Sequence, residues 1–600
     1  MAGFLVVWAA HSMPLLQSGC SGVQAEVVQA GHQVQVQAFP GGQMLVWRRS
    51  SGEFPLSGTL QHVHGHALAW LGQCVEDSGD ATQQALEQLA QPAWQDAVLA
   101  HLNGSFAAVS VSPQGELRLL TDRYRHYPIY LYQAGAYWVA SSEMRCIWPF
   151  MPDKRMSHSA IDMLLRSGEL IDRMTLLEGV DLLPPATVLT QPLGAAAGTL
   201  TERRYWQMQH QGHATRSFDD TAVLLADTLS AAVKRQESAA GKLGITLSGG
   251  LDSRIILDLC RHPEQVPSFT WGLDGCRDIA CATEFAQRVG SPHTVRHWQP
   301  EAFPPLWGQG VALTAGSFGV ESMYMLPFIP LLSSHCDVVL NGLAGDAILG
   351  GNFIKREWLG MQDLQQLGRS IWRWRVSPQE DVLVDGLMAS VRRPGTAAAG
   401  ELWAHSIAAH SGARPIERVN DWLYENRVFR NTNSGTMLLR SGVESHAPFF
   451  DRDFVDAVTT VKQEYKFKHR LYLDVMRRIA PRSAATTWQR TQIPPGWGYH
   501  ANLASMALHR VVNKVGKVLG VDPFPALKVA DPGAWMRGPW RSAVQDIVLG
   551  ASAQQRGLWS HNAAQALWQQ HLHGANHTRQ LGAMVAVELF AQQALDGVRP

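Results

Sequence analysis

The chain has 600 residues, which is enough for two or more domains with a substantial buried core. Its 51 basic and 51 acidic residues cancel, so the composition gives no reason to propose nucleic acid or a membrane surface as a partner. No apolar run approaches the ~20 residues that span a bilayer. The seven cysteines are scattered and lack the spacing of a zinc site. These features predict a cytoplasmic protein with reduced cysteines.

Strand patterns dominate residues 1–206. Residues 33–38 alternate polar and apolar side chains, as a half-buried strand does. Residues 106–120 and 130–140 each contain two apolar segments around a turn, which predicts two hairpins. A polar stretch follows them in the sequence. We therefore predict a β-rich first domain at 1–206 and a linker at 207–218.

The pattern changes from residue 219 onward. Helical periodicity over 221–237 alternates with short apolar strands at 268–272 and 338–340. This alternation is typical of an α/β domain with a doubly wound sheet. The chain beyond about residue 355 has mainly helical patterns. The second domain is predicted to span 219–600.

A glycine-rich turn at 248–253 follows the apolar run 243–247 and precedes a helical segment. Such a connection aims backbone N–H groups and a helix N-terminus at a phosphate group. Asp252 adds a hard carboxylate where Mg²⁺ would lie beside the phosphates. No Gly-Lys-Ser/Thr follows, so the turn is not a Walker loop. The predicted nucleotide contacts of this turn are Leu247, Ser248, Gly249, Gly250, Asp252 and Ser253.

A second apolar strand, at 338–340, also runs into glycines and an aspartate. The carboxyl ends of parallel strands meet at one edge of a sheet, where ligands collect. We therefore predict that Asp252 and Asp346 lie around one ATP–Mg²⁺ group, and that Asn341 and Gly342 contact the nucleotide. A single aspartate on such a turn is usually only a turn residue. The pair of turns carries the prediction.

Landmarks in both predicted domains resemble those of the asparagine synthetase family. In the first domain they are 102–106, Asp122 with Arg123, 127–130, 140–144, 183–185 and Tyr205 with Trp206. In the second domain they are 248–253, the turn that ends at Asp346, 444–451 and 488–499. The resemblance therefore extends over most of the chain.

The resemblance implies an α+β N-terminal-nucleophile-like sandwich, which is the family's glutaminase domain, followed by a synthetase domain. The synthetase domain would have the α/β adenine nucleotide alpha-hydrolase-like fold of the PP-loop ATP pyrophosphatases, with a helical C-terminal part. ATP and Mg²⁺ are implied as cofactors, with Asp252 and Asp346 as metal ligands. In the family, the strand end that matches Thr270, Trp271 and Gly272 lies against adenine and ribose.

The first domain departs from the family's glutaminase pattern. A working glutaminase of this family has Cys as its first mature residue, which acts as nucleophile with its own α-amine as base. Here the chain begins Met1-Ala2-Gly3, and Cys20 and Cys74 lie far from that position. We therefore expect this domain to have a structural or docking role, and glutamine not to be the nitrogen source.

Two positions in the second domain also depart from the family. Leu343 stands three residues before Asp346, where asparagine-forming members have Glu and the β-lactam synthetase branch has Tyr. Leu neither binds an ammonia equivalent nor takes a proton. Arg490 stands where those branches have a Lys, and it offers a bidentate contact to phosphate or carboxylate. The predicted catalytic set is Asp252, Asp346 and Arg490.

The residues expected to bind ATP are present, but the residue expected to bind ammonia is not. This combination predicts that the enzyme adenylates a carboxylate and that an amine of the bound substrate then displaces AMP. Lasso peptide cyclases fit this combination better than β-lactam synthetases do. We predict an ATP-dependent cyclase that joins an Asp or Glu side chain of a leader-trimmed precursor (core) peptide to its N-terminal amine. By resemblance, a leader peptidase and a leader-binding element act upstream as partners.

Two alternatives stay open from the sequence. One is asparagine synthesis, or another intermolecular or β-lactam-type amide synthesis, which activity with aspartate and ammonium salts would favour. The other is a non-catalytic binding protein that uses the synthetase fold as a scaffold. The pair Asp252 and Asp346 argues against the scaffold, since a scaffold needs neither carboxylate.

Overall fold

The computed structural model describes residues 1–600 except 10–13, 50–53, 78–79, 136, 192–199, 211–214, 352–354, 393–396, 522–527 and 600. Part of the predicted linker, 211–214, therefore lies outside the described residues. The last strand before the linker ends at Arg204, and the helix that follows it, α5, begins at Phe218. Within the described residues, no helix has the length and apolar character that crossing a membrane requires.

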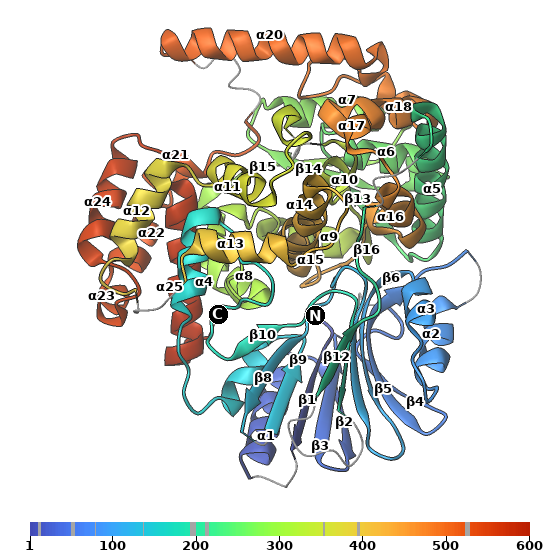
Figure 1. Ribbon diagram of the computed structural model, residues 1–600, viewed down its shortest axis with the longest axis vertical. Helices are drawn as coiled ribbons and strands as arrows, with labels where there is room; N and C mark the ends of the chain where they lie inside the picture. Colours follow the sequence, from blue (N-terminus) through green and yellow to red (C-terminus); the bar gives the residue numbers. More distant parts are fainter. Residues whose placement is uncertain are drawn as a thin grey trace.

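Two six-stranded antiparallel sheets form the first part of the chain (Figure 1). One sheet has the strand order β10-β8-β9-β1-β3-β2, and the other has the order β12-β11-β7-β6-β5-β4. The strands are β1 Gly3–Ala9, β2 Gln33–Phe39, β3 Gly42–Arg48, β4 Thr59–Val63, β5 His66–Cys74, β6 Gly104–Val111, β7 Leu117–Thr121, β8 Tyr130–Ala134, β9 Tyr137–Ser141, β10 Val180–Leu182, β11 Thr187–Gln191 and β12 Thr201–Arg204. The strands predicted in both hairpins and at 33–38 are thus confirmed.

Apolar side chains fill the space on both sides of these sheets. Phe4 and Val6 of β1 face the second sheet, whereas Leu5 and Val7 face helix α1 (Pro14–Gln29). The outer face of the second sheet packs on α2 (Ala81–Leu89), and α3 (Asp96–His101) lies beside it. The result is a four-layer sandwich in which helices cover two face-to-face sheets.

The second part of the chain is built on a five-stranded parallel sheet with the order β15-β14-β13-β16-β17. The chain starts at the central strand β13 and adds strands first on one side and then on the other. Two of these strands, β15 and β17, were not predicted. The bounds are β13 Leu243–Thr246, β14 Ser268–Gly272, β15 His293–His297, β16 Val338–Leu340 and β17 Glu444–His446.

Helices cover both faces of the parallel sheet, which confirms the predicted α/β arrangement. One face packs on α5 (Phe218–Ser238), α6 (Asp252–Leu259) and α7 (Arg277–Val289). The other face packs on α9 (Ile329–His335) and α15 (Ser434–Leu439). The Ser217 side chain caps α5 by accepting from Asp220 N at the start of that helix.

Helices dominate the chain beyond residue 355, as predicted, with β17 as an exception. They surround the sheet and extend away from it (Figure 1). The remaining helices are α4 His158–Ser167, α8 Trp307–Thr314, α10 Gly345–Leu349, α11 Leu364–Arg375, α12 Pro378–Met388, α13 Ala399–Ala408, α14 Pro415–Leu423, α16 Arg452–Thr459, α17 Gln463–Lys466, α18 Arg470–Ile479, α19 Pro481–Ala484, α20 Tyr499–Val518, α21 Pro532–Arg537, α22 Arg541–Leu549, α23 Ala551–Arg556, α24 His561–Leu572 and α25 Thr578–Asp596.

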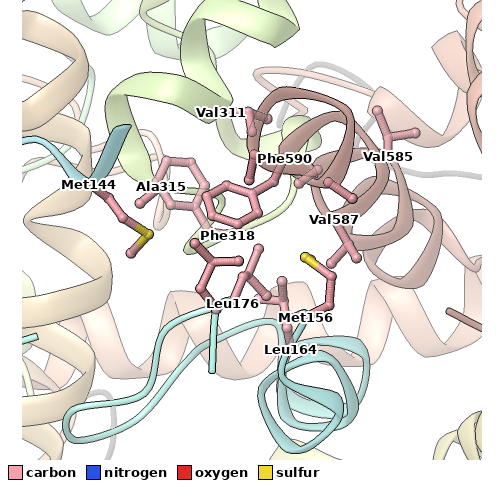
Figure 2. Close-up of a cluster of buried hydrophobic side chains, with 14 of the residues drawn as sticks. Met144, Met156, Leu164, Leu176, Val311, Ala315, Phe318, Val585, Val587 and Phe590 are labelled. Atoms are coloured by element: carbon pink, nitrogen blue, oxygen red, sulfur yellow. The ribbon is translucent and has the colours of Figure 1, made fainter. Parts of the chain in front are cut away.

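One apolar cluster joins the first part of the chain to its C-terminal helices. Figure 2 shows Met156, Leu164 and Leu176 beside Val587 and Phe590 of α25. The buried core therefore continues across the predicted domain boundary at 206. All seven cysteines are buried and none forms a disulfide, as predicted.

Candidate active site

A cavity of about 770 Å³ opens at the carboxyl edge of the parallel sheet. Thr246 at the end of β13, Trp271 in β14 and Asn341 after β16 all line it. Its volume lies within the ~300–1,000 Å³ that is usual for ligand pockets. The strand order reverses between β13 and β16, and doubly wound sheets bind their ligands at this point.

The two predicted metal ligands meet at this cavity. Asp252 is the first residue of α6, and Asp346 lies in the first turn of α10. The backbone N–H of Asp346 donates to Asp252 Oδ2 at 2.9 Å, which joins the two turns. The fold thus brings together two carboxylates that the sequence separates by 94 positions.

Each aspartate also has a hydrogen-bonding partner on a neighbouring side chain. The Tyr472 hydroxyl donates to Asp252 Oδ1 at 2.5 Å, and His469 Nε2 lies within hydrogen-bond distance of Asp346 Oδ1. Burial and the neighbouring charge of Asp346 raise the pKa of Asp252 to about 7. Two carboxylates this close repel each other when both are ionised, so the pair suits a divalent cation.

The donor set fits Mg²⁺ in particular. Mg²⁺ usually takes one or two protein carboxylates and completes its octahedron with waters and phosphate oxygens. Asp252 and Asp346 supply two such carboxylates on the cavity wall. Within the described ranges, no group of three or more His, Cys, Asp or Glu side chains forms a closed metal site. The residues present therefore suit a metal ion whose remaining ligands would be waters and phosphate oxygens of a bound nucleotide.

Glycine at two positions lets the turns approach each other. A Cβ atom at Gly342 would lie 2.7 Å from Asp252 Cβ and from Ser253 N. A Cβ atom at Gly345 would lie 2.6 Å from Asp252 Cγ. Any side chain at either position would push α6 away from the turn after β16, so both glycines are needed to bring Asp252 and Asp346 together.

The backbone N–H groups at 248–250 donate to side chains of the protein itself, which differs from their predicted role as phosphate donors. Ser248 N donates to Ser253 Oγ at 2.9 Å, and Gly249 N donates to Asp278 Oδ1 at 2.9 Å. Gly250 N donates to Ser248 Oγ at 3.2 Å. Nearby side chains already satisfy all three amides, which buried backbone donors require.

The start of α6 offers donors in their place. No side-chain hydrogen bond caps this helix after Leu251. Leu251, Asp252 and Ser253 all line the cavity, so the first turn of the helix faces it. A helix N-terminus with uncapped N–H groups attracts anions. The geometry therefore favours phosphate binding at the first turn of α6, with the hydroxyls of Ser248 and Ser253 beside it.

Most of the predicted nucleotide contacts line the cavity, but Gly249, Thr270 and Gly272 do not. Thr270 is 2% exposed, and its hydroxyl donates to Leu247 O at 2.7 Å. A Cβ atom at Gly272 would lie 2.7 Å from Cys276 Sγ, so this position packs against the chain that follows β14. The contacts that do line it are Leu247, Ser248, Gly250, Asp252, Ser253, Trp271, Asn341 and Gly342.

Trp271 forms an aromatic part of the cavity wall. Its ring stacks on Phe328 with centroids 4.8 Å apart and an interplanar angle of 6°. The apolar side chains of Met325 and Val529 line the same cavity. A flat indole beside apolar groups suits a planar heterocycle such as adenine.

A short segment before Arg490 is fixed against the glycine-rich turn. Arg254 is fully buried and donates from Nε to Gly250 O at 2.6 Å and from Nη1 to Thr487 O at 2.8 Å. Gln489 N donates to Gly249 O at 3.3 Å. These bonds hold 487–489 beside the start of α6.

Arg490 lies on the cavity wall, where it was predicted to act. Its Nη1 atom is 3.4 Å from His469 Nε2, and its guanidinium lies 5.9 Å from the centre of the Trp488 ring. The side chain is exposed to solvent. Its positive charge therefore lies on the wall of the same cavity as the two aspartates.

Three side chains that support the site were not predicted: Asp278, His469 and Tyr472. Asp278 anchors the glycine-rich turn from the first turn of α7, and burial raises its pKa to about 6. An acidic residue at a helix start after a strand was the available signal. His469 follows Lys468, and both have left-handed backbone angles, with φ of 66° and 50°. Nothing in the sequence signals this strained pair.

The cavity wall also includes Leu343, whose N–H donates to Asn341 Oδ1 at 3.0 Å. Among the described residues of this wall, the carboxylates are Asp252, Asp278 and Asp346, and there is no Glu or Tyr. Leu343 thus presents an apolar side chain at the position where the related branches have Glu or Tyr.

The first domain shows no activated cysteine among its described residues. Burial raises the pKa of Cys20 to about 11 and raises that of Cys74 well above its usual range. The thiolate is the reactive form, so both thiols are inert near neutral pH. Ala2 is 2% exposed and packs in the core between the two sheets.

Three polar residues of the first domain that resemble family landmarks, Asn103, Arg123 and Tyr127, contact the second domain. Each makes a hydrogen bond or ion pair with a side chain in 444–456. The pairs are Asn103 with Asp451 at 2.8 Å, Arg123 with Asp456 at 2.7 Å and Tyr127 with Glu444 at 2.8 Å.

The part of the chain that forms most of the cavity wall is similar to known proteins. Residues 224–490 match the family model described as asparagine synthase. A stretch of 188 residues is 29% identical to the glutamine-hydrolyzing asparagine synthetase 3 of Bacillus subtilis (strain 168), covering 30% of each chain. A stretch of 291 residues is 24% identical to a Mycobacterium tuberculosis (strain ATCC 25618 / H37Rv) protein that carries the name of a glutamine-hydrolyzing asparagine synthetase.

These matches are partial. The Mycobacterium tuberculosis match covers 47% of this chain and 44% of that protein, so the chain spans less than half the length of these relatives. A solved structure of the glutamine phosphoribosylpyrophosphate amidotransferase from B. subtilis is 12% identical over 49% of this chain and 65% of its own. Its TM-score of 0.22 is too low to support a comparison of folds.

The matched segment contains the glycine-rich turn, both aspartates and Arg490. The family consists of ATP-dependent amide-forming ligases that use ATP and Mg²⁺, and the two aspartates fit that metal. Over residues 224–490, which hold most of the cavity wall, the chain is therefore similar to the asparagine synthetase family.

Proposed function

We propose that the chain is an ATP-dependent ligase of the lasso peptide cyclase type. It adenylates an Asp or Glu side chain of a leader-trimmed core peptide and releases pyrophosphate. The N-terminal amine of the same peptide then displaces AMP and closes a macrolactam ring. The relatives' names support ATP-dependent amide formation, because both are asparagine synthetases. The ring-closing step rests on features of this chain's own cavity.

The position of Leu343 is the observation that carries the proposal. It lies on the cavity wall beside the paired aspartates, where it offers no group to hold ammonia or take a proton. An amine that arrives as part of the bound substrate needs no ammonia site. Holding both reacting ends in one cavity makes the second step unimolecular, which lowers its barrier by about 7–11 kcal/mol at good alignment.

The residues around the cavity have distinct roles in the adenylation step. Asp252 and Asp346 would hold Mg²⁺, which supplies charge neutralisation for the leaving pyrophosphate. The first turn of α6 and Arg490 present positive potential to the same developing charge. Tyr472 and His469 orient the two aspartates through hydrogen bonds.

Apolar side chains make the remaining wall suitable for a peptide. Leu439 and Trp488 line the cavity in addition to the apolar residues beside Trp271. Such a wall would hold apolar side chains of a core peptide while its carboxylate meets the nucleotide. We assign the first, N-terminal-nucleophile-like domain a structural or docking role, with a leader peptidase and a leader-binding element as its partners.

Pyrophosphate release in two parallel reactions tests the proposal. One reaction contains ATP, Mg²⁺ and the leader-trimmed core peptide, and the mass of the peptide is followed. The other contains ATP, Mg²⁺ and aspartate with ammonium or glutamine. The proposal predicts turnover only with the peptide, together with the loss of one water from its mass.

The alternative function is asparagine synthesis, which the names of the relatives favour. Turnover with aspartate and ammonium, and none with the peptide, would establish it. That result would also mean that Leu343 does not prevent ammonia from binding. An Asp252→Asn variant is the control in both reactions, because it removes a metal ligand while keeping the shape of the side chain.

A further inference from the structure

Helix α20 carries an exposed apolar stripe on its C-terminal half. Leu508, Val511, Val515 and Val518 are 62%, 60%, 53% and 82% exposed, and Leu519 directly after the helix is 71% exposed. Six of the fourteen strongly exposed large apolar side chains of the described chain lie between residues 508 and 521. Figure 1 shows α20 extending along the edge of the molecule, away from the parallel sheet. Apolar patches of this kind on a surface usually mark a binding site.

The stripe has the spacing of a helix-packing seam. Its positions advance by three, four and three residues, which keeps them on one side of an α-helix. The stripe is not the side of α20 that packs on the protein, because that side carries the buried residues Asn502 and Met506. Three of the four stripe residues are valines, and β-branched residues at such spacing favour packing against another helix.

Charge beside the stripe has one sign. The sequence of α20 contains no Asp or Glu. Arg510 and Lys514 lie one turn apart next to the stripe, and neither forms an ion pair with a described residue. A partner that covers the stripe would therefore bring its own acidic side chains to these two cations.

We propose that the C-terminal half of α20 is a docking surface for an acidic amphipathic helix of a partner protein. A second copy of this chain fits less well, because it would place Arg510 and Lys514 against identical positive charges. A membrane surface also fits less well, because the described stripe has no Trp or Phe of the kind that anchors interfacial helices. The inference is independent of the substrate proposed for the cavity.

Two residues in the middle of α20 and one residue beyond the helix connect the docking surface with the cavity. The ring Nδ1 of His509 lies 3.3 Å from Arg490 O, and the Ser505 hydroxyl donates to Thr491 O. Beyond the helix, Val529 lines the cavity, and its carbonyl accepts from Leu273 N at 3.0 Å. A partner seated on α20 would therefore lie beside the cavity that holds Arg490.

Fluorescence anisotropy with the full-length protein tests the proposal. The probe is a labelled synthetic helix of three heptads, with Leu at its a and d positions and Glu at its e and g positions. We expect it to bind the unmodified protein and to bind more weakly at high salt. The double variants Val511→Ser/Val515→Ser and Arg510→Glu/Lys514→Glu should each weaken binding by about tenfold or more.

Matched controls separate this site from general surface binding. Val382→Ser changes an equally exposed valine, 72% exposed on α12, and should leave binding unchanged. All variants should keep the thermal unfolding midpoint of the unmodified protein, because the substituted side chains are exposed. Equal binding by every variant, or equal binding of a probe with Lys in place of Glu, would overturn the proposal.

Two further measurements decide between occupants. Sedimentation of the protein alone detects self-association, and co-sedimentation with phosphatidylcholine–phosphatidylglycerol vesicles detects membrane binding. The proposal predicts neither effect. Self-association or vesicle binding that disappears in Val511→Ser/Val515→Ser, without binding of the acidic probe, would overturn the proposal in favour of that occupant.

Discussion

The polar landmarks of the two domains differ in what surrounds them. In the first domain, Asn103, Arg123 and Tyr127 each meet a complementary side chain in 444–456, at 2.7–2.8 Å. Around the cavity, by contrast, Asp252 and Asp346 place two like charges together on the cavity wall. The first arrangement pairs complementary groups within the protein. In the second, hydrogen bonds from Tyr472 and His469 orient the two carboxylates, but their mutual repulsion is offset only when a cation binds.

A residue pattern that resembles a family landmark can therefore mark a contact between the two parts of the chain as well as a reacting group. Removing a partner at the domain contact should leave a buried polar group unpaired and destabilise the fold. Removing a charge at the cavity should abolish chemistry without destabilising the protein. Stability and activity measured on the same variants therefore separate the two kinds of site.

The largest effect is expected at the aspartate pair. Asp252→Asn and Asp346→Asn should each lower the rate of pyrophosphate release by about 10⁴-fold, which corresponds to ~5.5 kcal/mol. The physical reason is the loss of a negatively charged metal ligand at the leaving pyrophosphate. Circular dichroism melts of the same variants should show no loss of stability. A variant that melts well below the unmodified protein would contradict the contrast drawn between the two regions.

A large stability effect is expected at the domain contact. Asp451 is fully buried and accepts from Arg235 Nη1 at 2.6 Å as well as from Asn103. Asp451→Ala should lower the free energy of unfolding by about 3–5 kcal/mol, because it leaves Arg235 buried without its closest partner.

The neighbouring Asp453→Ala is the matched control for this variant in urea denaturation. Its side chain is 40% exposed and also pairs with Arg235. Its loss should cost no more than about 1 kcal/mol. Equal effects of the two substitutions would mean that burial does not distinguish the contact.

A smaller effect on activity is expected at Arg490. Arg490→Ala should lower the turnover number by about 100-fold, because it removes one source of positive potential from the cavity. Arg490→Lys keeps the charge but not the bidentate geometry and should retain more activity than the alanine variant. The melting temperature should not change, since the side chain is exposed. Equal activity of both variants and the unmodified protein would exclude Arg490 from the chemistry.

The smallest effect concerns pH in the absence of Mg²⁺ and ATP. The pKa of Asp252 rises from 3.8 to about 7 on folding, so the folded state binds more protons between these values. Stability should therefore fall as pH rises from about 4 to 7, and this slope should be weaker in Asp252→Asn. At about pH 8 the variant should be the more stable protein by ~1–3 kcal/mol.

Urea denaturation at several pH values measures this difference. Adding Mg²⁺ with ATP should stabilise the unmodified protein and reverse the order of the two. A pH profile that is the same in both proteins would show that the aspartate pair carries no charge repulsion.

The sequence was sufficient to predict the glycine-rich turn, the paired aspartates and the alternation of strands and helices. These features depend on local apolar runs and on glycine at turns, which a sequence displays directly. The convergence of Asp252 and Asp346 followed from the general rule that parallel strands end at one edge.

Other features depend on contacts between distant segments. Strand β17 consists of the polar residues Glu444, Ser445 and His446, all buried, and Tyr127 of the first domain binds its glutamate. No apolar run marks this strand. The inward direction of the Gly249 amide likewise depends on Asp278, which lies 29 residues away. Such contacts form only once the chain is folded, so they could not be predicted from local sequence patterns.

One isotope experiment tests most directly the claim that this cavity activates a carboxylate and uses an amine from the same substrate. The core peptide carries ¹⁸O in its Asp or Glu side-chain carboxylate, and the reaction contains ATP, Mg²⁺ and ¹⁵N-ammonium. The account predicts one ¹⁸O atom in AMP, a peptide product that has lost one water, and no ¹⁵N in that product. AMP without ¹⁸O, or a product that contains ¹⁵N, would contradict it.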